Sequence, residues 1–317
     1  MKNHHTGLNH FIAGVPKSYI LKLGKILGLC LYFLDLPHRR LIQRNLRFCY
    51  PEWAPGDIRK MSLEIAKQSG ISILELIQSR YMAAEDIMAG FRIASGEEYL
   101  IASLKSPQGL IFAACHIGNW EVGLHYLGCI TRRTSGKPLT AVARKFRHGW
   151  LDNWFDQYRK RWGNNVIYKK GAWPNMVKTL RNGEALLITL DQSRYKQSIE
   201  VTFFNHKATT TPAVAMAAIR CRCPVLPIFC VREADGMQAV HVYPPIEMTR
   251  TNDLRNDLQV NTQKMIDAME DMIRKHPDQW AWFQRPWKKF HPELYPEWKM
   301  RRLQRKKKKK QRKQAAN

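Results

Sequence analysis

Short apolar runs alternate with amphipathic stretches after residue 105. The runs expected to form strands are Leu110–Ala114, Leu139–Ala143, Ala185–Leu190, Val201–Phe204, Val225–Val231 and Ala239–Tyr243. The stretches expected to form the intervening and final helices are Trp120–Cys129, His148–Trp162, Ala172–Arg181, Pro212–Arg220 and Asp253–His276. Alternating strands and helices are typical of an α/β fold, so we expect a mixed sheet flanked by helices.

The region before residue 105 has a helical pattern instead. From Asp57 to Tyr81 apolar residues recur at helical spacing, and Gly70 is expected to bend or divide that helix. Upstream, Ile26–Leu34 is an uncharged apolar run of nine residues, whereas a membrane-spanning helix needs about 20. Lysines precede this run and arginines follow it, which favours an N-terminal membrane-docking helix. The alternative is an ordinary amphipathic core helix.

The net charge changes the picture of what the protein binds. The chain has 52 Lys and Arg residues against 26 Asp and Glu, a formal charge of +26. Eleven of the basic residues lie between Lys299 and Lys313, so a disordered basic tail is expected over 299–317. The body keeps about +15, which indicates nucleic acid, anionic lipid or an acidic protein as partner. Before the tail we expect a membrane-associated segment over 1–50 and a catalytic domain over 51–298.

The cysteines and the missing motifs exclude several classes of protein. The seven cysteines are odd in number and match no zinc-binding pattern, and most have apolar neighbours, as is typical of small buried residues. We therefore expect a reducing, cytosol-facing location. The sequence contains no Gly-x-Ser-x-Gly elbow, P-loop, Gly-x-Gly-x-x-Gly run or His-Glu-x-x-His motif. We therefore expect neither a hydrolase nor a nucleotide-dependent enzyme, and no metal or other cofactor.

The candidate chemistry lies in the stretch LIFAACHIGNWE, residues 110–121. His116 comes directly after a predicted strand, where functional groups gather in open α/β sheets. Gly118 permits a turn and Asn119 is a good N-cap, which places Glu121 in the first turn of the next helix. We expect this carboxylate to fold back onto the imidazole, fix its tautomer and raise the basicity of the other nitrogen. Such a base deprotonates an alcohol that attacks a thioester. The alternative is a buried histidine that caps a turn.

The hexapeptide HIGNWE resembles the signature of the late (secondary) acyltransferases of lipid A biosynthesis, a lysophospholipid-acyltransferase-like family. Relatives in this family acylate other glycolipids, such as mycobacterial phosphatidylinositol mannosides. The resemblance extends from the N-terminal segment to about Phe290. Its further parts are, in order, Ala143–Lys145, Tyr158–Gly163, Asp191-Gln192, Phe203-Phe204, Ala208–Pro212 and Asp278–Trp282.

The resemblance implies an enzyme on the cytoplasmic face of the inner membrane. Such an enzyme moves a fatty acyl chain from acyl carrier protein, or sometimes coenzyme A, to a hydroxyl of a lipid A precursor. Another glycolipid or an aminolipid is the alternative acceptor. The family implies that His116 and Glu121 form the catalytic pair and that an arginine takes part, with Arg159 the best match and Arg144 the second. Asp191 matches the acidic residue that follows the third core strand.

Further side chains near these positions are candidates for substrate binding. Arg144 and Arg159 suit bidentate binding of phosphate, although Arg159 alternatively lies in a solvated helix end. Asp191 ends a strand of the same sheet and is expected to border the same cleft, where it would orient an arginine or the acceptor sugar. The remaining candidates are Asn119, Gln192 and Thr210. Thr210 and its neighbours are alternatively the N-cap of the following helix.

Tryptophans mix with basic residues near the C-terminus: Trp280, Trp282, Trp287 and Trp298. This pattern fits a membrane interface and a packed aromatic cluster equally well. The high charge also fits a nucleic-acid-binding protein, which is the best alternative from another class. The sequence has no zinc-finger spacing, RNP-like strand or basic-leucine pattern, so we expect no specific nucleic-acid partner.

Overall fold

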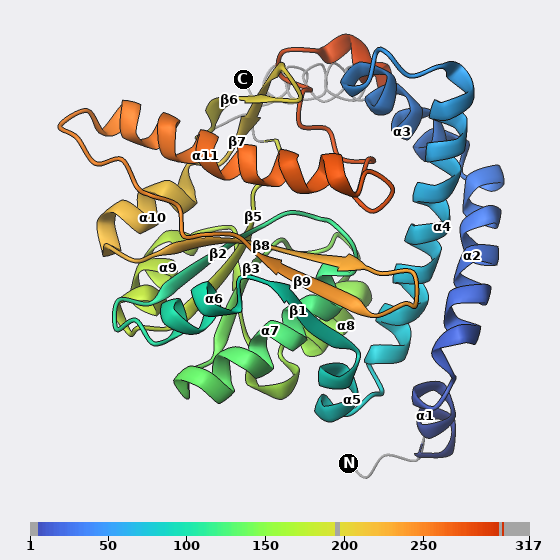
Figure 1. Cartoon of the computed structure of the whole chain (residues 1–317), viewed down its shortest axis with the longest axis horizontal. Coiled ribbons are helices and arrows are strands. Elements are labelled where there is room, and N and C mark those ends of the chain that lie inside the picture. Colours follow the sequence, from blue (N-terminus) through green and yellow to red (C-terminus); the bar gives the residue numbers. More distant parts are fainter. Residues whose placement is uncertain (1–5, 194–196, 298–299, 301–317) are drawn as a thin grey trace, which may run out of the picture.

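The computed structural model of the chain describes residues 6–193, 197–297 and 300. Within them a seven-stranded sheet has the order β1-β9-β8-β2-β5-β3-β4 (Figure 1). Neighbouring strands are parallel except β8 and β9, which are antiparallel, so the expected mixed α/β sheet is confirmed. Its strands are β1 (Phe91–Ser95), β2 (Leu110–Ala114), β3 (Leu139–Ala143), β4 (Asn165–Tyr168), β5 (Ala185–Thr189), β8 (Val225–Arg232) and β9 (Gln238–Val242).

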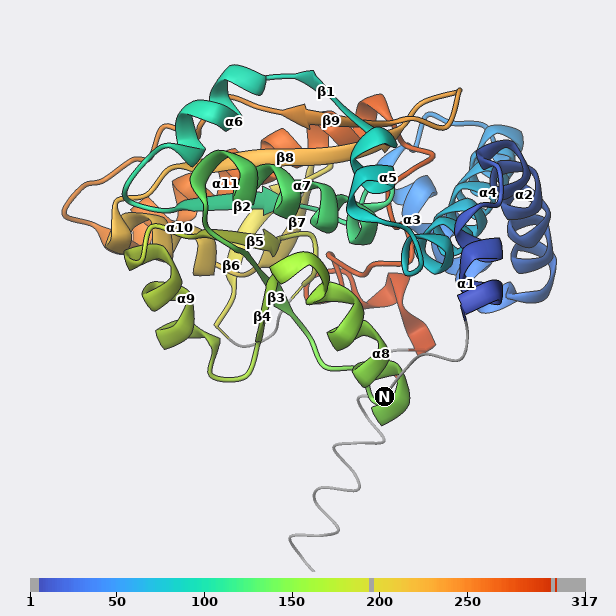
Figure 2. The same ribbon diagram turned by 90° about the horizontal axis from the view of Figure 1, so that it is seen from below.

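Helices cover both faces of this sheet. The helices are α1 (Thr6–Ala13), α2 (Lys17–Leu34), α3 (Leu36–Cys49), α4 (Pro55–Ser79), α5 (Ala84–Ala89), α6 (Glu97–Leu104), α7 (Trp120–Ser135), α8 (Gly149–Arg159), α9 (Ala172–Arg181), α10 (Ala213–Cys221) and α11 (Leu254–Lys275), with the short 3-10 helices η1 (Arg161–Gly163) and η2 (Pro292–Leu294). Phe112 of β2 packs with residues of α5, α6 and α7, whereas Ala113 packs with residues of α9, α10 and α11. Figure 2, turned by 90°, agrees with Figure 1 that α7 and α11 lie on opposite faces. Every residue of β2 and β8 is therefore buried, which explains their continuous apolar runs.

The N-terminal helices stand beside one end of the sheet (Figure 1). Gly70 does not divide its helix, because α4 runs unbroken from Pro55 to Ser79. Gly70 instead lets α2 approach closely: a Cβ there would lie 2.2 Å from the carbonyl oxygen of Gly24. On α2, a Cβ at Gly28 would lie 2.4 Å from the carbonyl oxygen of Ala66. The absence of a side chain at these glycines therefore allows the close helix–helix contact.

A separate hairpin, β6 (Ile199–Phe203) and β7 (His206–Thr210), packs against α11. Its two-residue loop has positive φ at Phe204 (52°) and Asn205 (59°), as a type I′ turn requires. Thr210 thus belongs to a strand, and the reading of this threonine as a helix N-cap is wrong. The cap of α10 is Pro212, and the hydroxyl of Thr211 accepts the backbone N–H of Ala213 at 3.3 Å.

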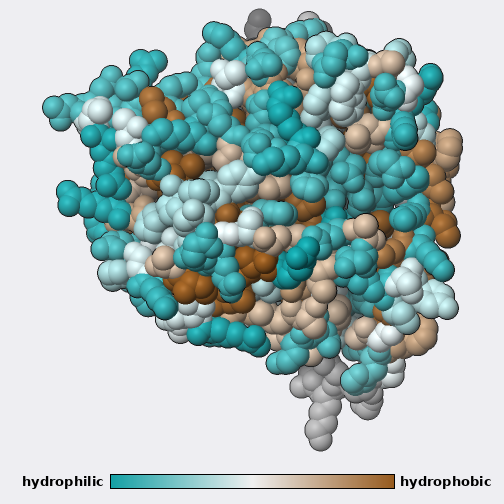
Figure 3. Space-filling view, in the orientation of Figure 1, coloured by the Kyte–Doolittle hydropathy of each residue, from teal (hydrophilic) through white to brown (hydrophobic). Residues whose placement is uncertain are grey.

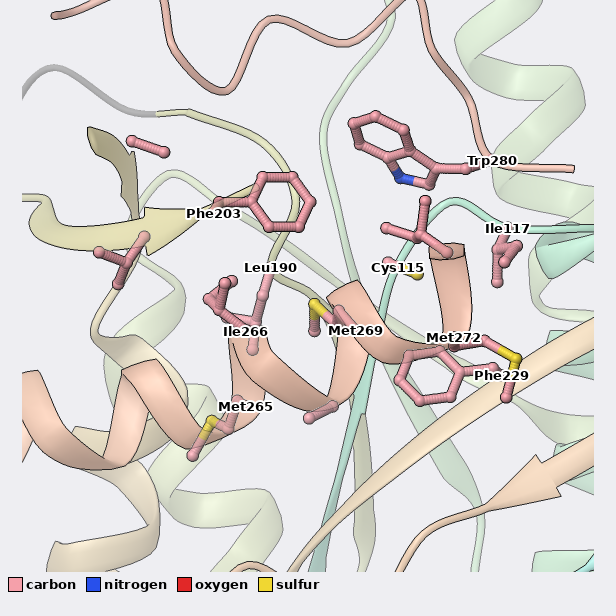
Figure 4. Packing of buried hydrophobic residues seen from close by; sticks show 14 of the residues in the cluster. Cys115, Ile117, Leu190, Phe203, Phe229, Met265, Ile266, Met269, Met272 and Trp280 are labelled. Atoms are coloured by element: carbon pink, nitrogen blue, oxygen red, sulfur yellow. The ribbon is translucent and has the colours of Figure 1, made fainter. Parts of the chain in front are cut away.

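The segment after α11 returns to the core. Trp280, Trp282 and Trp287 are 1, 0 and 0% exposed, so these residues form a packed aromatic cluster and not a membrane interface. Figure 4 shows Trp280 beside Ile117 and Phe203, above the methionines of α11. The three indoles therefore pack the C-terminal segment against the carboxyl ends of the strands, where His116 lies. Trp298 and, apart from Met300, the predicted tail over 299–317 lie outside the described residues.

Candidate active site

The turn after β2 is held from two sides. Ile117 pairs with Trp280 in an isolated antiparallel bridge. In this bridge the Ala281 N–H donates to the carbonyl of His116 at 2.9 Å, and the Gly118 N–H donates to the carbonyl of Gln279 at 3.0 Å. Gly118 has φ +56°, and a Cβ there would lie 2.0 Å from the carbonyl oxygen of Cys230. Only glycine fits this turn, which fixes the direction of the His116 side chain.

The carboxylate bound to His116 is Asp191. His116 Nδ1 lies 2.7 Å from Asp191 Oδ1, and the His116 backbone N–H donates to Asp191 Oδ2 at 2.9 Å. Trp280 Nε1 donates to the same Oδ2 at 2.9 Å. Burial by itself raises the pKa of Asp191, but the charge of His116 and the three hydrogen bonds outweigh it and lower this pKa. The ionised carboxylate accepts a hydrogen bond from the Nδ1–H group, which leaves Nε2 as the unprotonated, basic nitrogen.

The expected contact between Glu121 and His116 is wrong. Glu121 forms a two-pronged ion pair with Arg159, in which Arg159 Nε donates to Glu121 Oε2 at 2.9 Å and a terminal nitrogen donates to Oε1. The two side chains are 15 and 12% exposed. Burial lowers the pKa of Arg159, but the carboxylate of Glu121 more than compensates, and the pKa is raised. Glu121 does lie in the first turn of α7, and Asn119 caps this helix as expected by accepting the Val122 N–H at 3.4 Å.

The amide of Gln192 links His116 to a cation. Its Nε2 lies 3.3 Å from His116 Nε2, and its Oε1 accepts a hydrogen bond from Lys169 Nζ at 3.2 Å. The ring of Trp120 lies edge-on to the imidazole, with centroids 5.0 Å apart. The free nitrogen of His116 is thus bordered by one amide and one aromatic ring, while the side chain keeps 14% exposure.

The other predicted binding residues have different surroundings. Arg144 is exposed directly after β3. Asn119 is 3% exposed, and its Nδ2 donates to Glu75 Oε2 at 2.8 Å. Thr210 is 2% exposed and donates to the carbonyl of Leu190. The polar groups of Asn119 and Thr210 are therefore used inside the protein, where they hold the ends of helix α7 and strand β5.

A buried ion pair near the site escaped the sequence reasoning. Arg232, at the end of β8, donates to both carboxylate oxygens of Glu75 on α4, at 3.0 and 2.6 Å. Gln279 accepts the backbone N–H of Arg232 at 2.7 Å and donates to its carbonyl at 2.8 Å. Through Asn119, this network connects α4 to the turn that carries His116. Scattered polar residues on different elements give no sequence signal for such a network.

A narrow apolar pocket begins at the same strand end. It lies between β2, α7 and β8, and its lining includes Cys115, Ile117, Trp120, Leu124, Leu127 and Ile228. Apart from Thr189, the lining side chains carry no oxygen and no charge. The site thus combines a basic nitrogen with an adjacent apolar space, an arrangement that suits a substrate with a hydrocarbon part.

Comparisons with known proteins show the family to which the chain belongs. Residues 6–289 match the family model described as bacterial lipid A biosynthesis acyltransferase. The lipid A biosynthesis lauroyltransferase of Escherichia coli is 24% identical over 294 residues, which is 92% of either chain. The phosphatidylinositol mannoside acyltransferase of Mycobacterium tuberculosis is 26% identical over 200 residues, 62% of this chain and 60% of that protein.

A further relative is the lipid A biosynthesis palmitoleoyltransferase of Escherichia coli, 21% identical over 78% of each chain. The names of these relatives specify different acyl groups, and all of them describe acyltransferases, of lipid A biosynthesis or of phosphatidylinositol mannoside. The family model covers nearly the whole described structure, including both strand ends that hold His116 and Asp191. The chain therefore belongs to the bacterial lipid A biosynthesis acyltransferase family.

Proposed function

We propose that the protein transfers a fatty acyl chain from an acyl-carrier-protein thioester to a hydroxyl of a lipid A precursor at the cytoplasmic face of the inner membrane. The observation that carries this proposal is the hydrogen bond of 2.7 Å between His116 Nδ1 and Asp191. It leaves Nε2 as a base at the carboxyl end of a central strand, next to an apolar pocket. Coenzyme A is the alternative carrier of the acyl chain.

The acyl chain passes directly from donor to acceptor in a complex that holds both substrates, without a covalent acyl-enzyme. The acceptor hydroxyl replaces the Gln192 amide at Nε2 and gives its proton to His116, while its oxygen attacks the thioester carbonyl. The carbon–sulfur bond then breaks, the new ester bond remains, and the imidazolium returns the proton to the leaving thiolate. Asp191 stabilises the imidazolium formed between these two events. The acyl chain lies against the apolar side chains that follow β2, Ile117 and Trp120, at the opening of the narrow pocket.

Glu121 and Arg159 act through their ion pair. The pair ties the first turn of α7 to α8, and Trp120, which borders His116, is the residue before Glu121. We therefore assign Glu121 and Arg159 a role in positioning Trp120, and Arg144 a role in substrate binding. Asn119 and Thr210 position the strand and helix ends.

The outer side of the N-terminal helices is proposed to dock on an anionic lipid surface. None of the helices within the described residues is both long and apolar enough to cross a membrane. On α1 and α2, however, Phe11, Ile26 and Phe33 are 72, 55 and 63% exposed. Figure 3 shows hydrophobic atoms along the edge where α2 runs in Figure 1. Exposed Lys22 and Lys25 lie between these apolar side chains, as is typical of an interfacial helix.

Docking is tested by sedimentation with vesicles. The double variant Ile26→Glu/Phe33→Glu is expected to lose binding to vesicles that contain phosphatidylglycerol, because both changes put a carboxylate on the apolar face. The matched control Ala102→Glu/Gln108→Glu adds the same two carboxylates at exposed sites away from α2 and should bind nearly as the native protein does. Equal sedimentation of the α2 variant and this control would contradict docking through α2.

Transfer itself is tested with labelled acyl carrier protein and a lipid A precursor. Mass spectrometry should detect one added acyl chain with the native protein and none with His116→Ala. Addition of a chain by the variant would disprove the role of His116. If the native protein leaves the precursor unchanged, lipid A is not the acceptor. A phosphatidylinositol mannoside is then the next acceptor to test, because two relatives carry that name.

A further inference from the structure

Basic residues follow β3 and β4, the last two strands on one side of the sheet. β3 and β4 are parallel and in register, with Ala143 opposite Tyr168. The residues that come next are Arg144 and Lys169, and the Lys169 N–H donates to the carbonyl of Ala143 at 3.0 Å. Both cations therefore leave the sheet at its carboxyl edge. In open α/β sheets this edge is where ligands bind.

The same edge carries the proposed base. The sheet order places β5 between β3 and β2, so Gln192 and His116 follow neighbouring strands. Lys169 Nζ lies 3.2 Å from Gln192 Oε1, and Gln192 Nε2 lies 3.3 Å from His116 Nε2. One side-chain amide is thus all that separates the ammonium group from the imidazole. A substrate group bound at Lys169 would be next to the reacting atoms.

A third cation comes from the C-terminal segment. Lys288 Nζ donates to the carbonyl of Ser193 at 3.0 Å, one residue beyond Gln192. Burial lowers the pKa of Lys288 to about 8, and the positive charges of Arg285 and Arg144 contribute to this decrease. Lys288 is therefore close enough to Arg144 for their charges to repel. Cations held together at a free-energy cost gain from binding a multivalent anion.

We propose that Arg144, Lys169 and Lys288 form a subsite for a phosphate group of a substrate. A guanidinium and two ammonium groups supply enough donors for the oxygens of one phosphate, and Arg144 contributes a planar fork. The subsite deepens the proposed acyl transfer and depends on it for its location beside the base. The phosphate belongs either to the phosphopantetheine arm of the donor or to the head group of the acceptor lipid.

Binding is measured by calorimetric titration with two pairs of probes. Coenzyme A is compared with pantetheine, which lacks phosphate, and lysophosphatidic acid with monoacylglycerol in the same detergent. The variants are Lys169→Met and Lys288→Met, with Lys169→Arg to restore the charge. Lys178→Met is the matched control, because Lys178 is exposed in the last turn of α9, away from the edge where this helix begins. The thermal midpoint of each protein shows that it is folded.

Loss of one charge-assisted hydrogen bond is expected to raise the Kd of a phosphate probe about tenfold or more. This loss should occur in both Met variants, be largely reversed in Lys169→Arg and be absent in Lys178→Met. An effect confined to coenzyme A identifies the donor as the source of the phosphate, and an effect confined to lysophosphatidic acid identifies the acceptor.

The proposal is overturned if the native protein binds the phosphate probes no better than their neutral counterparts. It is also overturned if a folded Lys169→Met and a folded Lys288→Met both bind as Lys178→Met does. Because binding and not transfer is measured, these results are separate from the outcome of the acyl-transfer assay. A protein that binds phosphate without transferring an acyl chain would contradict the proposed function and leave the subsite standing.

Discussion

Replacing Asp191 by Asn tests the assignment of the base most directly. Asp191 Oδ2 accepts two N–H groups, from the His116 backbone and the Trp280 indole, both at 2.9 Å. An Asn side chain has one oxygen, and two fixed donors compel it to occupy the place of Oδ2. Its NH2 group then takes the place of Oδ1, which lies 2.7 Å from His116 Nδ1. The NH2 group donates to Nδ1, so the proton of the imidazole moves to Nε2 and the base is lost.

The expected loss of rate is large and the loss of stability small. The corresponding Asp→Asn change in the triad of serine proteases lowers kcat by about 10⁴, through the wrong tautomer. A similar decrease here corresponds to about 5.4 kcal/mol in the barrier, at about 1.36 kcal/mol per factor of ten. In the new arrangement the His116 and Trp280 N–H groups keep their acceptor, and Nδ1 accepts a hydrogen bond in place of donating one. The free energy of unfolding should therefore fall by no more than about 1–3 kcal/mol, the usual range for weakened hydrogen bonds to a charged group.

The assay is the kcat of acyl transfer followed by mass spectrometry, with urea unfolding of the same samples. Asp271→Asn is the matched control. Asp271 is 46% exposed and accepts hydrogen bonds from Lys275 and Tyr243, on the opposite side of α11 from the proposed chemistry. Replacing this carboxylate should therefore leave kcat unchanged. A folded Asp191→Asn protein that keeps more than about a tenth of the native kcat would refute the reasoning, since a wrong tautomer cannot act as a base.

Three further predictions use other parts of the structure. Glu121→Gln leaves the buried charge of Arg159 without its ion pair, so unfolding in urea should show a loss of about 3–5 kcal/mol; a loss below about 1 kcal/mol would contradict this. Gly70→Ala should destabilise the protein by about 1–3 kcal/mol, because its Cβ would lie 2.2 Å from the carbonyl oxygen of Gly24. This loss is expected although alanine has a higher helix propensity than glycine. Gly56→Ala in the same helix has no neighbour within 4 Å and serves as the control; equal effects would refute the close contact. The lowered pKa of Lys288 means that the folded state binds fewer protons than the unfolded state between about pH 8 and 10.5, so native stability should rise with pH across this range. Lys288→Met should lack this rise in thermal melting, and an identical pH dependence in both proteins would contradict the burial of the ammonium group.

Much of the sheet was predictable because its central strands are buried on both faces. β2 and β3 were predicted with the bounds that the structure has, and both are apolar runs. The strands that escaped prediction in this sheet, β1 and β4, are its two edges. Edge strands carry exposed and polar positions, as in FRIAS and NVIY, so no continuous apolar run marks them.

The candidate site was predictable in part. His116 was identified from its place after a strand, and that place is confirmed. Its carboxylate was assigned to the wrong residue because local spacing favoured Glu121, five positions away, over Asp191, 75 positions away. The choice depends on β5 lying directly beside β2, which places the backbone N–H of Leu190 3.0 Å from the carbonyl of Ala114. Strand order is a property of the whole fold and is not encoded in the motif.

The segment after α11 explains why a residue so close to the C-terminus belongs to the site. Trp280 donates to the carboxylate that holds His116, and its backbone pairs with Ile117, one residue after the base. One residue therefore controls both ends of the hydrogen bond between Asp191 and His116. The adjacent Gln279 binds Gly118 and Arg232 and thereby connects the same turn to the buried ion pair on α4. A base held by its carboxylate, its turn and its neighbouring strand needs little reorganisation when the proton moves, which is the condition for efficient proton transfer in an apolar site.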